Sequence, residues 1–216
     1  MKTVKWVLAF AGAMLAGGVA YGQAPPPSAA PAPSPAQAPT QTPATTTAPT
    51  RVSVQTSMGE ITLELDRQHA PVSVDNFLRY ANEGHFDGTI VYRVVPGFVI
   101  QAGSFEPDLR QRPVHEPIAM EANNGLSNTR GSLAMARDDD PNSATAEFFI
   151  DLADNTRLDH HADDVGNTTG YTVFGHVVSG MDVIDRMAAV PLGDHGPMPG
   201  AAPVEPIVIT KVSVLP

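Results

Sequence analysis

The sequence predicts a mainly β domain, folded as an antiparallel barrel or sandwich, that follows an N-terminal segment of different composition. From residue 51 onward, short runs alternate between hydrophobic and polar residues, as in strands that bury one face. Only two stretches have the periodicity of a helix. Parallel strands need long crossover connections, which are usually helices, so two helices are too few for a parallel sheet.

Residues 1–22 have the features of a secretory signal peptide. Lys2 and Lys5 precede an apolar run over residues 6–19, and Ala20-Tyr21-Gly22 supplies small residues before the expected cleavage at Gln23. We therefore expect export to the periplasm and no stable membrane insertion after cleavage. The alternative is a retained membrane anchor, although the apolar run is shorter than the roughly 20 residues of a spanning helix.

Residues 23–50 contain no charged residue and consist almost entirely of Pro, Ala, Thr, Ser and Gln. Such a segment cannot bury a core, so we interpret it as a disordered spacer, partly in the polyproline-II conformation. A ligand for a proline-binding domain is the alternative, but the basic residues that usually orient such ligands are absent. The folded domain is then predicted over residues 51–216.

Composition excludes several classes of function. The chain has 216 residues, no Cys and a formal net charge of −10, and loss of Lys2 and Lys5 with the signal changes this charge to −12 (−10 minus 2). Without Cys there are no disulfides, no thiol catalysis and no thiolate metal sites. The acidic balance argues against binding to nucleic acid or to anionic membranes. We expect a monomer that meets other proteins only transiently.

The first elements of the domain are a hairpin and a helix. Hydrophobic and polar residues alternate over 52–65, around the turn Ser57-Met58-Gly59-Glu60, which predicts two antiparallel strands. Over residues 71–82 the apolar positions instead recur at i, i+3, i+4 and i+7, which predicts an amphipathic helix. We expect Ser73 as its N-cap and Gly84 as its C-terminal stop.

Strands and a second helix complete the domain. We expect the helix over residues 179–188, with Ser179 as its N-cap. Residues 192–203 are predicted to form a Gly/Pro loop, and residues 205–215 the last strand. The strands between the two helices are predicted at residues 90–95, 97–102, 132–136, 147–152 and 171–178.

Arg93 is the one charged residue in the apolar run that opens this series of strands. It is interpreted either as a paired core charge or as a functional group. Alternate residues share a face of a strand, so we expect Val91 and Val95 on the side of Arg93, and Tyr92 and Val94 on the other.

The strand after the Pro96-Gly97 turn follows the same rule. Val99 and Gln101 are expected to share one face, and Phe98 and Ile100 the other.

Several familiar chemistries are absent from the sequence. It contains no G-x-S-x-G elbow, no P-loop and no dinucleotide-binding fingerprint. The acidic run over residues 138–142 lacks the Gly and the terminal Glu of a calcium loop, and we expect a solvated turn. Residues 160–164 contain His160 and His161, but adjacent side chains diverge, so we expect no metal site.

Seven short blocks occur in order along the domain. They are Arg93, Pro96-Gly97-Phe98, Gln101, Asn128-Thr129-Arg130-Gly131, Met135-Ala136, Phe148-Phe149-Ile150 and Val173-Phe174-Gly175. Together they resemble the signature blocks of the cyclophilins, which are peptidyl-prolyl cis-trans isomerases. The resemblance covers about Val52 to Pro216. It is nearest to the bacterial periplasmic members, through Leu158-Asp159-His160 and the closing Val214-Leu215-Pro216. It implies a closed eight-stranded antiparallel β-barrel capped by two α-helices.

The resemblance also implies roles for individual residues. Rotation of a prolyl peptide bond needs no nucleophile, metal or cofactor, only an environment that prefers the twisted amide. By resemblance, Arg93 stabilises that state electrostatically, and Gln101 binds the substrate backbone and helps to hold Arg93.

By resemblance, Phe98, Val99, Phe149, Leu158 and Tyr171 line the pocket for the proline ring. Ala136 and Arg137 match the strand edge that pairs with the residues before proline. From spacing alone, core packing is the simpler role for the aromatic residues, and it is the role we expect of Phe77, Phe148 and Phe174.

The sequence departs from the family pattern at six positions. Tyr92 replaces a common His and is expected to point away from the site, and Arg157 replaces the Trp with which eukaryotic members bind cyclosporin. We therefore expect weak cyclosporin binding. The other departures are Val99 for Met, Arg137 for Asn, Glu147 for Gln and Tyr171 for His.

The function expected from these residues is prolyl isomerisation of unfolded or partly folded exported proteins and of X-Pro peptides. A proline-binding chaperone or scaffold with little turnover is the alternative, because the pocket is altered. A third possibility is an envelope-tethered interaction module, in which the spacer over residues 23–50 matters more than the pocket.

By resemblance, the segment 160–170 borders the pocket, and it is longer than the matching segment in short members of the family.

Overall fold

A computed structural model of the chain describes residues 49–161, 169–194, 196–197 and 199–216. The predicted signal peptide over residues 1–22 and almost all of the predicted spacer over 23–50 lie outside these residues, as does most of the segment 160–170. Among the described residues, no helix has the length and apolar character needed to cross a bilayer.

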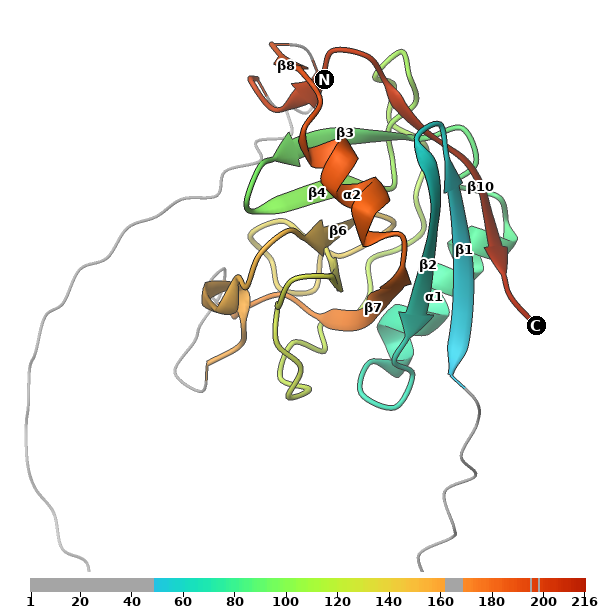
Figure 1. Ribbon diagram of the computed structural model, residues 1–216. Helices are drawn as coiled ribbons and strands as arrows, with labels where there is room; N and C mark the ends of the chain where they lie inside the picture. The colour runs from blue at the N-terminus through green and yellow to red at the C-terminus, as the bar shows by residue number, and fades with distance from the viewer. Residues whose placement is uncertain (1–48, 162–168, 195, 198) are drawn as a thin grey trace, which may run out of the picture. The chain divides into compact units, whose positions relative to one another are not determined.

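Eight strands of the described chain close into a barrel in the order β1-β10-β3-β4-β6-β5-β7-β2 (Figure 1). Every neighbouring pair in this order is antiparallel. The closed antiparallel barrel is therefore confirmed. The strands are β1 Thr50–Thr56, β2 Gly59–Leu65, β3 Ile90–Val95, β4 Val99–Ala102, β5 Ser132–Met135, β6 Phe148–Asp151, β7 Val173–Ser179 and β10 Ile207–Val214.

Two helices pack on the barrel, as expected. Helix α1, Pro71–Asn82, lies against β7 and β10, and helix α2, Met181–Ala188, lies against β2 and β3 (Figure 1). A 3-10 turn, η1, spans Thr156–Leu158. The predicted Gly/Pro loop over 192–203 is wrong in part, because β8 Leu192–Gly193 and β9 Ala202–Pro203 pair within it.

Both predicted N-caps are wrong. Helix α1 begins directly after Ala70, and Ser73 lies in its first turn, where its hydroxyl donates to Glu121 Oε2 at 2.7 Å. Ser179 is still paired within the barrel, and the N-cap of α2 is Gly180, with a φ of 89°. A Cβ on Gly180 would lie 2.5 Å from the Glu60 carbonyl oxygen, so this turn requires glycine.

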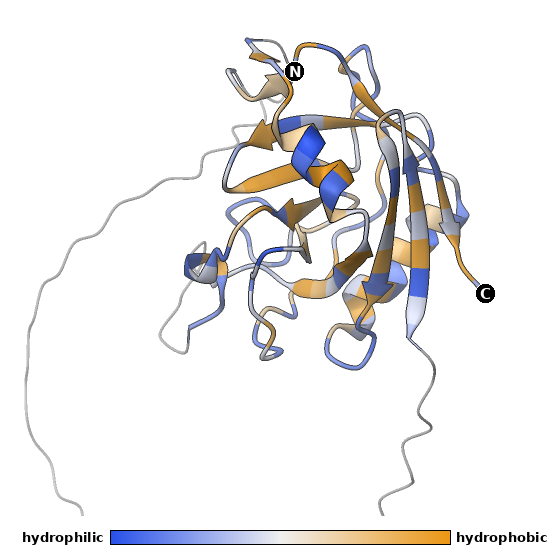
Figure 2. Ribbon diagram, in the orientation of Figure 1, coloured by the Kyte–Doolittle hydropathy of each residue, from blue (hydrophilic) through white to orange (hydrophobic). Residues whose placement is uncertain are grey.

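The hydrophobic core fills the barrel. Alternating residues of the strands point inward, and the banding of hydrophobic and hydrophilic residues along β1 and β2 is visible in Figure 2. Phe77 of α1 packs on Phe86 and Phe148, with ring centroids 5.0 and 5.4 Å apart. Phe77, Phe148 and Phe174 all belong to this core, as predicted.

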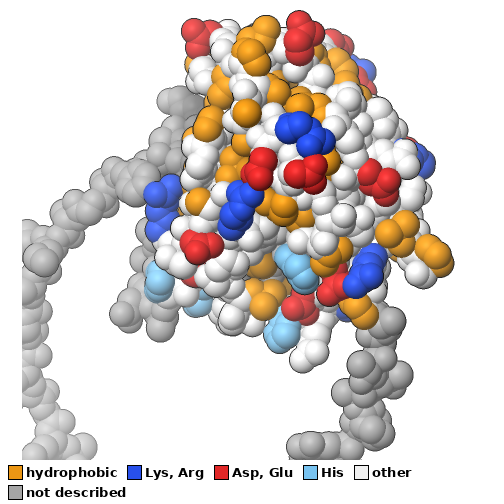
Figure 3. Space-filling view, in the orientation of Figure 1, with side chains coloured by type: hydrophobic (Ala, Val, Ile, Leu, Met, Phe, Trp, Pro, Cys, Tyr) orange, Lys and Arg blue, Asp and Glu red, His pale blue; other side chains and the backbone are white. Residues whose placement is uncertain are grey.

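The surface around α2 carries interspersed charges of both signs (Figure 3). Arg186 pairs with Asp182 one turn earlier on the helix, and Arg130 bonds Asp185. Exposed pairs of this kind contribute little to stability individually.

Candidate active site

A second, smaller hydrophobic cluster lies outside the barrel core. It consists of the buried residues Val99, Ala134, Ala136, Phe149, Leu158 and Val173, with Phe98, Leu126 and Tyr171 packed at its margin. Six of the residues predicted for substrate binding thus lie together, although nothing in the sequence pattern alone joins them. They are Phe98, Val99, Ala136, Phe149, Leu158 and Tyr171.

Alternation along β4 and β6 separates this cluster from the core. Val99 faces outward while Ile100 faces the barrel interior, and on β6 Phe149 faces outward between the inward Phe148 and Ile150. The expected faces of β4 are therefore right for Val99.

Phe98 does not lie on the face predicted for it. It precedes β4, in the turn that follows Pro96, so strand alternation does not apply to it. Its ring packs on the outward cluster together with Val99.

Arg93, Gln101, Phe149 and Ala134 form one row across four neighbouring strands. Arg93 pairs with Gln101, Gln101 with Phe149, and Phe149 with Ala134. Residues in such register share a face of the sheet, so the cation lies beside the apolar cluster.

Arg93 is partly buried and has no carboxylate partner within salt-bridge distance among the described residues. Its Nη1 donates to Gln101 Oε1 at 3.1 Å. Burial lowers the pKa of Arg93, and the neighbouring Tyr92 and Tyr171 oppose that shift. The interpretation of Arg93 as an ion-paired core charge is therefore wrong.

Strand alternation predicted that Tyr92 points away from the site, and this prediction is wrong. The register of β3 against β4 shifts between Val91 and Arg93, so Tyr92 is the extra residue of a bulge. Its hydroxyl donates to Glu147 Oε2 at 2.5 Å, and Gln101 Nε2 donates to the same oxygen at 2.9 Å. Because of the shift, Val91 lies in the barrel core rather than beside Arg93.

The family model "Cyclophilin type peptidyl-prolyl cis-trans isomerase/CLD" matches residues 51–214. The chain belongs to this family.

Two bacterial cyclophilin relatives are similar over most of their length. Peptidyl-prolyl cis-trans isomerase A of Dickeya dadantii is 46% identical over 164 residues, which are 76% of this chain and 84% of the relative. Peptidyl-prolyl cis-trans isomerase B of Escherichia coli is 46% identical over 163 residues, which are 76% of this chain and 98% of the relative.

A crystal structure of a Cryptosporidium parvum cyclophilin type peptidyl-prolyl cis-trans isomerase has a TM-score of 0.63. It is 22% identical and covers 77% of this chain and 98% of its own. At this identity the likeness supports the fold alone.

Two arginines lie over aromatic rings at the margin of the second hydrophobic cluster. The Arg137 guanidinium lies 4.7 Å from the Tyr171 ring centroid, and that of Arg157 lies 4.6 Å from that of Phe98. Tyr171 in turn packs edge-on against Phe149, with centroids 5.5 Å apart. Aromatic faces attract cations, so each arginine holds a pocket ring in place.

The side chain of Arg137 is buried. Its Nε and Nη2 both donate to the Gly170 carbonyl, at 3.0 and 2.9 Å. Together with its stacking, this bond supports Tyr171 from behind. The backbone NH of Ala136 is bonded to the Glu147 carbonyl. The pairing of the Ala136 and Arg137 edge with substrate stays a prediction.

Polar groups behind the pocket were not identified from the sequence. Asn155 Nδ2 donates to the Phe98 carbonyl at 2.9 Å and to Asp151 Oδ1 at 2.7 Å, so it ties the turn of Phe98 to a buried carboxyl. Burial raises the pKa of Asp151 to about 7, against the hydrogen bond from Asn155. Asp151 is the last residue of β6, and the alternation of residues along that strand does not indicate that its carboxyl group is buried and bonded to Asn155.

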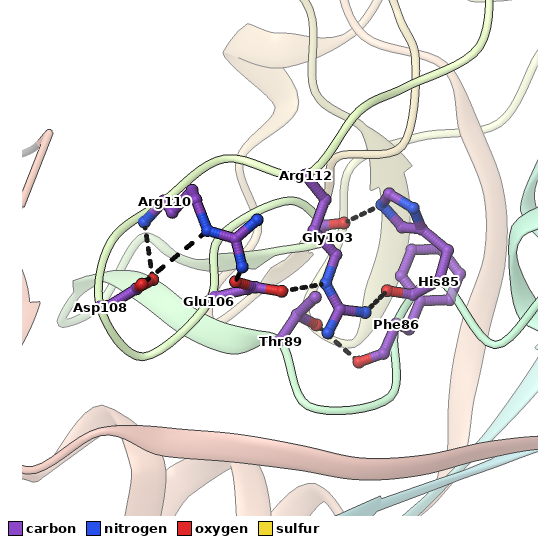
Figure 4. Close-up of polar contacts among 8 residues, drawn as sticks. All are labelled: His85, Phe86, Thr89, Gly103, Glu106, Asp108, Arg110 and Arg112. Carbon is purple, nitrogen blue, oxygen red and sulfur yellow. Dashed lines mark hydrogen bonds and ion pairs between the residues drawn. The ribbon is translucent and has the colours of Figure 1, made fainter.

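The segment that follows β4 is tied to the segment that follows α1 (Figure 4). Arg112 donates to the His85 carbonyl at 2.5 Å and to Glu106 Oε1 at 3.0 Å, and His85 Nε2 donates to the Gly103 carbonyl at 3.0 Å. These bonds fix the chain at Phe105, whose ring lies 4.6 Å from that of Tyr92. The position of Tyr92 is thereby fixed on a second side.

The described residues of the segment 160–164 do not belong to any cluster that could hold a metal ion. His160 Nδ1 donates to the Thr169 carbonyl at 3.1 Å. Residues 162–168 lie outside the described chain.

Proposed function

We propose that this cyclophilin accelerates rotation about X-Pro bonds while exported proteins fold in the periplasm, and that Arg93 stabilises the twisted amide. The observation that carries this assignment is the position of Arg93, next to an apolar pocket and without a carboxylate partner among the described residues. A cation already neutralised by a carboxylate would have little field left for a substrate.

The reaction needs electrostatics and shape only. Rotation about a peptide bond costs roughly 18–20 kcal/mol because resonance is lost, and the nitrogen regains a lone pair as the bond twists. A fixed donor beside that nitrogen makes a stronger hydrogen bond to the twisted amide than to either planar form. An interaction that is stronger in the transition state than in the ground state is what catalysis requires. Gln101 holds the guanidinium at Nη1 and leaves its other N–H groups available to a substrate.

The apolar pocket supplies the second requirement, which is a fixed proline ring. An apolar surface for a ring without polar atoms is offered by Phe98, Val99, Phe149, Leu158 and Tyr171. If the proline ring is held in place, rotation about the X-Pro bond must move the residue before proline. The barrel then provides the rigid support for the residues that hold the ring.

Exchange NMR on a short X-Pro peptide tests the assignment. Wild type is expected to accelerate the cis-trans exchange, and Arg93→Ala to lose about 100-fold or more of that rate, as when one fixed donor is removed from an active site. Arg110→Ala is the matched control, since Arg110 is an exposed arginine of the segment after β4. Equal rates for wild type and a folded Arg93→Ala protein would contradict the proposal.

A proline-binding chaperone with little turnover is the second candidate. It is favoured by the Arg157 guanidinium on the Phe98 ring, which occupies one approach to the pocket. The same NMR experiment separates the two, because a binding module broadens or shifts the peptide signals without accelerating exchange.

The place and state of the protein are separate proposals. The periplasmic location rests on residues 1–22, and cell fractionation with N-terminal sequencing of the mature protein tests it. The monomeric state is tested by sedimentation velocity of residues 23–216.

A further inference from the structure

Four side chains form a continuous hydrogen-bonded line that ends at the proposed catalytic arginine. Tyr92 donates to Glu147 Oε2, Gln101 Nε2 donates to the same oxygen, and Arg93 Nη1 donates to Gln101 Oε1. The proposed function uses Arg93 and Gln101 but assigns nothing to Tyr92 and Glu147. Both are buried, with 2% and 3% of their surfaces exposed. A buried carboxylate at this place requires an explanation.

We propose that Glu147 and Tyr92 are positioning residues, which determine the direction in which the side-chain amide of Gln101 faces and thereby hold the Arg93 guanidinium. This inference rests on the proposed function for its effect on rate. It adds two residues and a proton-dependent element to that function.

The side chain of Gln101 lies between Glu147 and Arg93, which have opposite hydrogen-bonding characters. A side-chain amide has one donor end and one acceptor end, whereas an ionised carboxylate only accepts and a guanidinium only donates. With Glu147 on one side and Arg93 on the other, one orientation of Gln101 makes both bonds. The reversed orientation would set oxygen against carboxylate and NH₂ against guanidinium. A neutral amide at position 147 can donate or accept, so only Arg93 would still favour this orientation.

The hydrogen bond from Tyr92 favours the charged form of Glu147, against the effect of burial on its pKa. The Tyr92 hydroxyl gives Glu147 Oε2 a second donor, while Oε1 has no hydrogen-bond partner among the described residues. The bulge at Tyr92 is what turns this side chain toward Glu147, and bulges commonly redirect side chains beside active sites. The same short stretch of β3 thus supplies both ends of the line.

The groups around Glu147 act in opposite directions. Burial has the largest effect and raises its pKa, and the charge of Asp138, after β5, raises it further; the hydrogen bonds from Tyr92 and Gln101 lower it. Arg93 lies beyond Gln101 on β3. Once Glu147 takes up a proton, it can donate as well as accept, and both orientations of Gln101 become possible. Arg93 then loses its acceptor in a fraction of the molecules.

A pH profile of peptide exchange tests the inference. The wild-type rate is expected to fall as the pH decreases from 7.5 to 5. Glu147→Gln is expected to be at least threefold slower at pH 7.5 and nearly independent of pH, so that the two rates approach each other in acid. Tyr92→Phe keeps the carboxylate but removes a donor, so its fall begins at higher pH. Glu121→Gln, at a carboxylate that bonds Ser73 instead, should follow the wild type.

A second readout separates this inference from the proposed function. In the NMR spectrum of wild type, the Arg93 Nε–H and Gln101 side-chain amide signals should titrate together with the Glu147 carboxyl carbon, and should not titrate in Glu147→Gln. An Arg93 signal that stays constant while Glu147 titrates overturns the inference, whether or not peptide is turned over. Linked titration without any acceleration of exchange would instead refute the proposed function and leave the positioning intact.

Discussion

The Arg157 guanidinium lies over the ring of Phe98, 4.6 Å from its centroid. Arg157 lies in η1, directly before Leu158 of the predicted proline pocket, so it places a charge at the edge of that predicted pocket. An indole at this position would offer a flat apolar wall and a single N–H donor. Replacing a tryptophan by arginine at position 157 therefore changes which ligands can lie against Phe98, but it does not change the barrel.

Cyclosporin binding is expected to be weak for this reason. Arg157→Trp is predicted to tighten it at least tenfold, because an apolar wall replaces a cation that must be desolvated. Titration calorimetry of wild type and variant measures the difference. Arg110→Trp, on an exposed loop, is the control and should leave the affinity unchanged. A nanomolar affinity of the wild type would show the expectation to be wrong.

Arg93→Lys distinguishes charge from geometry. Lysine keeps the positive charge but lacks the planar fork that reaches Gln101 and a substrate together, so we expect a loss of about 10- to 100-fold in kcat/KM, smaller than the loss in Arg93→Ala. Peptide exchange rates measure this. A Lys variant as active as wild type would mean that charge alone is sufficient.

Asp151 gives the domain a pH-dependent stability. Its pKa is raised in the folded state to about 7, above its ordinary value, so its contribution to stability is complete below about pH 4 and is lost as the pH rises through 7. Asp151→Asn should therefore raise the unfolding temperature at pH 8.5, by about 2–4 °C for each kcal/mol gained, and much less at pH 5.

Thermal unfolding followed by circular dichroism at the two pH values measures this effect. Asp139→Asn, at an exposed aspartate, is the control. If Asp151→Asn changes the unfolding temperature equally at both pH values, the titration of Asp151 is not the cause.

Gly97 and Gly103 are a matched pair for backbone strain. Both have positive φ, 71° and 128°, but a Cβ on Gly97 would meet no atom within 4 Å, whereas one on Gly103 would lie 2.5 Å from the Ala146 carbonyl oxygen. Gly97→Ala should cost about 1–2 kcal/mol of unfolding free energy from the conformation alone. Gly103→Ala should cost clearly more and should also slow turnover, because the clash adjoins Glu147. Urea unfolding compares them, and equal costs would contradict this account.

The sequence predicted the composition of the pocket better than its supports. Val99 and Gln101 follow from strand alternation, and the family resemblance brought Phe149 and Tyr171 to the same place, where they meet. The line from Tyr92 to Arg93 was missed, since it depends on a register shift that arises only when β3 pairs with β4.

Other supports depend on packing between distant segments. The raised pKa of Asp151 arises from burial of its carboxyl group. Strand alternation predicts the face on which a side chain lies but not its degree of burial, which here depends on the packing of later residues such as Asn155. The N-cap of α2 at Gly180 was missed because serine is a usual N-cap residue and Ser179 directly precedes it. In the structure Ser179 is still paired with β2, so the helix begins one residue later than predicted.

The two faces of β4 and β6 have separate consequences for how this protein can change. Ile100 and Phe148 pack in the barrel core, whereas their neighbours Val99 and Phe149 belong to the outward cluster that we propose binds the substrate. Because Val99 and Phe149 are themselves buried, a substitution there keeps the fold best when the new side chain is apolar and of similar volume. Families built this way can diversify their clients under selection while the scaffold stays the same, and a library of such side chains at the outward positions should yield mostly folded proteins.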